Sequence, residues 1–162
     1  MSEVHSPQGI RQSEQHLSPV LESATREVFE LMLESKLEPL SATDTGMATE
    51  LIAMVGLSGR LSGFVSVHCP AEAASRMAAR MLHIANQAYD DTARDAVGEV
   101  CNMVAGSFKT KLGFNSDECR LTVPTIITGS ACEMDTGPGG LHVKLPLRFD
   151  GSPICIVLDL RN

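Results

Sequence analysis

The alternation of hydrophobic and polar residues is most regular between Asp90 and Leu112, where apolar residues recur at the three- and four-residue spacing of an amphipathic helix. The apolar side consists of Val97, Val100, Cys101, Val104, Phe108 and Leu112. The opposite side carries Asp95, Glu99, Asn102, Gly106 and Lys109, which we call the polar stripe. Glu99 and Asn102 are three residues apart, so they should project side by side from neighbouring turns.

Most polar stripes of this kind are solvated faces of surface helices. Two features favour contact with a partner instead. Gly98 and Gly106 each cost roughly 1 kcal/mol relative to Ala in a helix interior, and Met103 lies at the edge of the polar stripe, where a soft apolar contact suits a partner. Packing of this helix on another element of the same chain would explain both glycines equally well.

The amino-terminal part of the chain predicts a flexible arm followed by a helix. Residues 1–17 are polar and show neither helical nor strand periodicity, so we expect them to be a flexible arm preceding a domain of residues 18–162. Ser18 and Pro19 are typical of an N-cap and a first helical position. The helix that they open should end before Pro39, and residues 40–48 should form a loop.

The remaining pattern predicts strands on both sides of two helices. Residues 49–69 indicate a hairpin that turns at residues 58–60, and His68 should be a solvated residue near the end of its second strand. Pro70 opens an Ala- and Met-rich helix before the one at Asp90. Three closing strands are predicted at residues 118–129, 141–149 and 153–160. Pro124 marks the first of them as an edge strand or as a strand with a bend. Residues 137–140 should form a loop. The expected fold class is α+β, with a mainly antiparallel sheet and the order α-β-β-α-α-β-β-β.

Composition and charge narrow the possible functions of this 162-residue chain. Its net charge of -7, its scattered basic residues and its few aromatic residues argue against a nucleic-acid partner or an anionic membrane surface. No apolar run is long enough to span a membrane or direct export, so we expect a cytoplasmic protein with reduced cysteines. No metal-ligand spacing is present, and Cys101 lies on the apolar side of its helix, so it should be a buried residue rather than a nucleophile.

The polar stripe contains Asp95, Glu99 and Asn102, and Gly106, Lys109 and Pro124 follow them in the sequence. This series resembles the signature of the CheC/CheX family of chemotaxis phosphatases. The resemblance covers roughly residues 18–160 and includes the glycine-bearing hairpin. The spacing from Asn102 to Pro124 is slightly shorter than in the family motif. The predicted helix that begins at Ser18 lacks a Glu followed three residues later by Asn. The chain is therefore more similar to CheX, which has one helix with this Glu/Asn pair, than to CheC, which has two.

The resemblance implies that the substrate is the phosphoaspartate of a CheY-type response regulator in chemotaxis or two-component signalling. Asn102 would position the attacking water and Glu99 would anchor a lysine of the regulator. The partner surface would also include Asp95, Met103, Gly106 and Lys109. The protein would need no cofactor of its own, because Mg²⁺ is expected on the regulator, and it would form a homodimer partly through exposed strand edges, as CheX does.

Two other functions fit the same helix. A non-catalytic module related to flagellar switch proteins could use the polar stripe to bind a receiver domain without hydrolysing its phosphate. A hydrolase using Asp95 and Glu99 as paired carboxylates is less favoured, since two residues four apart on one helix do not flank a substrate.

Overall fold

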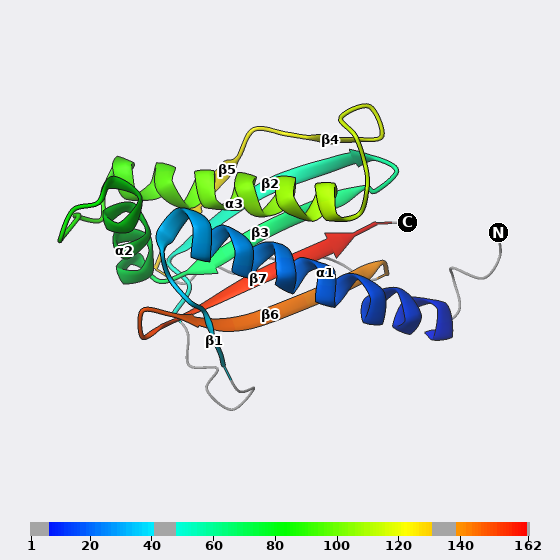
Figure 1. Cartoon of the computed structure of the whole chain (residues 1–162), viewed down its shortest axis with the longest axis horizontal. Helices are drawn as coiled ribbons and strands as arrows, with labels where there is room; N and C mark the ends of the chain where they lie inside the picture. The colour runs from blue at the N-terminus through cyan, green and yellow to red at the C-terminus, as the bar shows by residue number, and fades with distance from the viewer. Residues whose placement is uncertain (1–6, 41–47, 131–138, 162) are drawn as a thin grey trace.

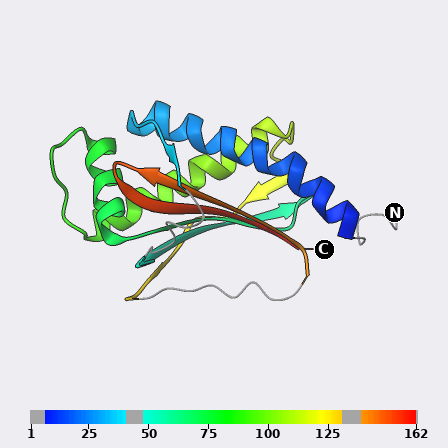
Figure 2. The ribbon, with the colours of Figure 1, turned by 90° about the horizontal axis from the view of Figure 1, so that it is seen from below.

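The computed structural model describes residues 7–40, 48–130 and 139–161, which form one antiparallel sheet with three helices on one of its faces (Figure 1, Figure 2). The helices are α1 (Pro7–Leu33), α2 (Ala71–Leu82) and α3 (Asp91–Lys111). The strands are β1 (Glu38–Pro39), β2 (Leu51–Gly59), β3 (Gly63–Cys69), β4 (Cys119–Leu121), β5 (Thr125–Thr128), β6 (Leu141–Phe149) and β7 (Ser152–Leu160). The expected α+β class and the element order are confirmed.

The sheet has the strand order β1-β6-β7-β3-β2-β4, and β5 also pairs with β2. Every pairing is antiparallel. Alternate residues of the long strands turn towards the helices and form an aliphatic core, as the period of two requires. Phe29 of α1 and Phe149 of β6 meet edge to face within it, with ring centroids 5.3 Å apart. The core therefore joins the first helix to the last hairpin.

Pro124 does interrupt the first closing strand, as its lack of an N–H predicts. The segment becomes two short strands, β4 and β5, which pair in turn with different parts of β2. The two-residue strand β1, which pairs with Leu147 and Arg148 of β6, was not expected from the sequence.

The predicted start of the first helix is wrong. Helix α1 begins at Pro7 rather than at Ser18, so Pro19 lies inside it and residues 7–17 are not an unstructured arm. Pro19 removes one helical hydrogen bond, but Leu17 and Val20 on either side both pack against the core and stabilise the continuous helix. The first six residues of the expected arm lie outside the described residues, as do most of the predicted loop at 40–48 and the first half of the loop at 137–140.

His68 differs from its expected solvated state. It lies next to the end of β3 and is half-buried, with Nε2 2.9 Å from the Ser66 hydroxyl oxygen. Burial, together with the charge of Lys144, lowers the pKa of His68 to about 4. The imidazole is therefore neutral at physiological pH. In the described part of the chain, no helix combines the length and apolar character needed to cross a membrane.

Candidate active site

Helix α3 lies over the sheet between α1 on one side and the chain that runs from β4 to β5 on the other (Figure 1). The Asp90 side chain caps its start by accepting a hydrogen bond from the Ala93 N–H at 3.2 Å. The expected apolar side faces the sheet, since Val97, Val100, Cys101, Val104 and Phe108 are all fully buried. The opposite side is therefore left for solvent or a partner.

Cys101 is a core residue. Its Sγ lies 3.4 Å from the backbone oxygens of Ala53 in β2 and Val65 in β3. Burial raises the pKa of this thiol to about 12, so it stays protonated. It cannot act as a thiolate nucleophile at neutral pH.

The polar stripe follows the outer side of α3. Asp95 and Glu99 are exposed, while Asn102, Gly106 and Lys109 are half-buried, as is Met103 at the edge of the stripe. Within residues 7–40, 48–130 and 139–161, no hydrogen bond or ion pair engages the side chains of Asp95, Glu99 or Asn102. An exposed carboxylate and a carboxamide on adjacent turns are therefore both available to a partner.

The two glycines of α3 have different surroundings. A Cβ built on Gly98 would lie 3.2 Å from Ile126 Cδ1 and 3.4 Å from Pro124 Cβ, so Gly98 lets the β4–β5 chain approach the helix. A Cβ built on Gly106 would meet nothing within 4 Å. Packing inside the chain thus accounts for Gly98 only. Gly106 leaves an open position on the polar stripe, one turn beyond Asn102.

Pro124 lies against α3 at Gly98. Val123, the residue before Pro124, therefore also lies near α3, and it is 84% exposed. The sequence analysis did not single out Val123. The available signal was an apolar residue immediately before a proline in an otherwise strand-like segment.

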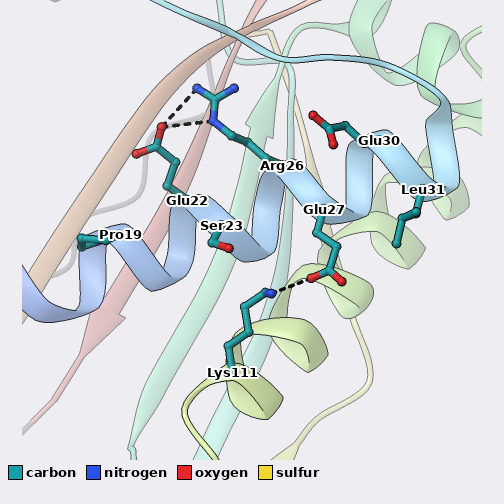
Figure 3. A pocket seen from close by; sticks show the side chains of 8 residues that line it. All are labelled: Pro19, Glu22, Ser23, Arg26, Glu27, Glu30, Leu31 and Lys111. Atoms are coloured by element: carbon teal, nitrogen blue, oxygen red, sulfur yellow. Dashed lines mark hydrogen bonds and ion pairs between the residues drawn. The ribbon is translucent and has the colours of Figure 1, made fainter.

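A concave surface lies along α1 (Figure 3). This groove of about 700 Å³ is lined by Pro19, Glu22, Ser23, Arg26, Glu27, Glu30, Leu31 and Lys111. Its charges are largely paired with one another: Glu22 lies 3.1 Å from Arg26, and Glu27 lies 2.7 Å from Lys111 of α3. No residue of the polar stripe lines it. The part of the chain that the structure describes contains no cluster of three or more potential metal ligands.

Residues 51–145, more than half of the chain, match the family model described as "Chemotaxis phosphatase CheX". The chain belongs to the CheX family. A curated relative, the CheY-P phosphatase CheX of Thermotoga maritima, is 24% identical over 111 residues, which cover 68% of this chain and 70% of the relative.

Solved structures of CheX proteins have the same fold as this family member. Chemotaxis protein CheX from Desulfovibrio desulfuricans superposes with a TM-score of 0.74 at 22% identity, covering 90% of this chain and 99% of that one. CheX in the CheX–CheY–BeF3–Mg²⁺ complex from Borrelia burgdorferi gives a TM-score of 0.68 at 23% identity, with 89% and 97% coverage. The helix that carries the polar stripe lies within the matched region.

Proposed function

We propose that this CheX family protein is an aspartyl-phosphate phosphatase that acts on the receiver domain of a CheY-type response regulator. The observation that carries the proposal is the pair formed by the exposed Glu99 and the half-buried Asn102, whose side chains have no partner within the described residues. The pair lies next to the open position at Gly106. The named activity of the Thermotoga relative and the CheX–CheY complex from Borrelia support the same substrate class.

The phosphatase needs to supply few catalytic groups, because an acyl phosphate is already activated towards hydrolysis. A water oxygen attacks phosphorus, the bond from phosphorus to the aspartyl oxygen breaks, and the products are inorganic phosphate and the regulator's free carboxylate. The regulator's own Mg²⁺ neutralises charge on the phosphoryl group. The remaining requirement is to hold the water in line with the breaking bond.

Asn102 is suited to hold this water, because a carboxamide both donates and accepts hydrogen bonds. Fixing the water in line is catalysis by proximity, which we expect to contribute about two to three orders of magnitude in rate. Glu99, one turn away, would pair with a lysine of the receiver domain. Asp95, Met103, Gly106 and Lys109 would complete the contact surface.

The test is phosphate release from phosphorylated receiver domains of the same genome, with the receiver in tenfold or greater excess over this protein. We expect several phosphates to be released per molecule. Tight binding of a phosphorylated receiver without faster release would contradict the enzyme and favour a receiver-binding module related to flagellar switch proteins.

We further propose that the protein is a homodimer joined partly through its sheet. The outer edge of β6 is paired with β1 only at Leu147 and Arg148, so its residues 141–146 present backbone groups along the edge of the described sheet. Sedimentation should show a dimer at tens of micromolar protein. A monomer at that concentration would contradict this proposal and leave the phosphatase proposal unaffected.

A further inference from the structure

Val123 is the most exposed large apolar side chain among the described residues. A single exposed apolar residue is ordinary on a protein surface and needs no explanation by itself. What distinguishes Val123 is that the backbone on both sides of it is fixed, so that its Cα is held in one place on the surface.

Thr122 fixes the backbone on the amino-terminal side. Its N–H donates to the Gly56 carbonyl of β2 at 3.0 Å, and its hydroxyl oxygen accepts from the Gly56 N–H at 2.8 Å. The same hydroxyl donates to the Val123 carbonyl at 3.2 Å. A Cβ on Gly56 would lie 2.9 Å from Thr122 Cγ2, so the glycine provides the room for this close contact. Together these three hydrogen bonds fix the backbone of Thr122 and Val123 against β2.

Pro124 fixes the backbone on the carboxyl-terminal side. Its ring locks its own φ and restricts Val123, the residue before it, to extended conformations. The ring also packs at Gly98 of α3, where a Cβ would come within 3.4 Å of Pro124 Cβ. Gly98 is adjacent to Glu99 and one helical turn before Asn102. The fixed segment therefore borders the polar stripe.

We propose that Val123 is an apolar contact for the receiver domain and that Thr122 is the positioning residue that holds it beside Glu99 and Asn102. This rests on the proposed function, because the same partner must approach the polar stripe. A segment whose backbone is already fixed loses little freedom when a partner buries it, and this favours binding. The proposed role of Val123 is in affinity for the receiver domain, since an apolar side chain offers no group for the hydrolytic step.

The experiment measures both the affinity for a beryllofluoride–Mg²⁺ receiver domain and the rate of phosphate release at saturating receiver. Val123→Ser should weaken binding about tenfold, equal to about 1.4 kcal/mol, with the saturated rate unchanged. Leu82→Ser is the matched control, because Leu82 is an exposed apolar residue on α2 and its loss should leave the affinity unchanged. Wild-type affinity in Val123→Ser would overturn the proposal.

Thr122→Val keeps the shape of the side chain and removes the hydroxyl, so it should weaken binding about threefold while the saturated rate stays the same. Thr122→Ser retains the hydroxyl and should restore the affinity. Thr128→Val, the same change at an exposed threonine of β5, is the control. Equal affinity in Thr122→Val and wild type, or a failure of Thr122→Ser to restore binding, would overturn the role of Thr122.

These outcomes are separable from those of the proposed function. If the wild type binds the receiver but releases no phosphate, the phosphatase is contradicted and the binding measurements still test Val123. If the wild type releases phosphate and Val123→Ser binds normally, only the role of Val123 is overturned. A wild type that does not bind any receiver domain overturns both.

Discussion

Helices α1 and α3 lie side by side on the same face of the sheet, yet their polar sides differ (Figure 1). On α1, Glu22 pairs with Arg26, whose guanidinium also donates to the Leu37 carbonyl at 2.7 Å. Glu27 pairs with Lys111 of α3 at 2.7 Å (Figure 3). Glu22 and Glu27 of α1 are thus engaged within the chain. On α3, no such partner engages Asp95, Glu99 or Asn102 in the described residues.

This difference favours α3 over α1 as the proposed partner surface. A ligand in the groove along α1 would have to compete with existing ion pairs. Exposed ion pairs stabilise a protein little, so their presence on α1 is weak evidence of function or of stability. Polar groups without partners, together with an open glycine in a helix interior, are features that stability alone would not favour.

The largest expected effect is that of Asn102→Ala on the rate of dephosphorylation. The substitution removes the amide that holds the water but no charge, so the single-turnover rate should fall about two to three orders of magnitude with receiver affinity nearly unchanged. Ser107→Ala, on the side of α3 that faces Glu27 of α1, is the matched control and should keep the wild-type rate. A normal rate in Asn102→Ala would remove the proposed mechanism.

The second largest expected effect is that of Glu99→Ala on the affinity for the receiver domain. Loss of a charged hydrogen bond to a desolvated lysine is worth about 1.5 to 3 kcal/mol, so receiver binding should weaken roughly ten- to hundredfold. Glu27→Gln on α1 removes one acidic charge at a paired position and should leave binding unchanged.

Glu99→Gln distinguishes an anchor from a general base. An anchor loses affinity in this variant, whereas a general base would retain affinity and lose both the rate and the pH dependence of the rate. Dephosphorylation and binding measured between about pH 5 and 8 would separate the two, and the second pattern would contradict the assignment of Glu99 as an anchor.

The two glycines of α3 offer a smaller but sharper comparison. Gly106→Ala should raise the free energy of unfolding by about 0.5 to 1 kcal/mol, because the new methyl group meets open space, and should weaken receiver binding severalfold. Gly98→Ala should stabilise less, since its Cβ crowds Ile126 and Pro124. Urea unfolding and receiver titration of both variants provide the check. Unchanged affinity in Gly106→Ala would mean that this open position has no part in binding.

The smallest effect concerns the ion pair between α1 and α3. The hydrogen bond and charge of Lys111 lower the pKa of Glu27, so the folded state favours the carboxylate. Its contribution to stability is present above the ordinary pKa of 4.5 and is lost as the pH falls through the lowered value. Glu27→Gln should therefore melt slightly below wild type at neutral pH, and the difference should disappear in acid. A difference that grows in acid would contradict this assignment.

Local signals in the sequence predicted much of this arrangement. The apolar side of α3 and the hairpin of β2 and β3 both depend on residues close together in the chain, and the structure contains them. The polar stripe could likewise be located from helical periodicity, although periodicity could not distinguish a solvated face from a partner surface.

Features that depend on distant contacts could not be predicted. Helix α1 continues through Pro19 because Leu17 and Val20 pack on the core, which local helix propensity does not record. Gly98 and Gly106 look alike in sequence, and the positions of Ile126 and Pro124 distinguish them. The position of Val123 depends on the hydrogen bond between Thr122 and Gly56 of β2, two residues that are far apart in the sequence.

Amide hydrogen exchange, with and without a beryllofluoride–Mg²⁺ receiver domain, tests most directly whether α3 rather than α1 is the working surface. We expect the receiver to slow exchange along residues 95–109 of α3 and at Val123, and to leave residues 22–31 of α1 unchanged. Slowed exchange along α1, with α3 unaffected, would contradict the account.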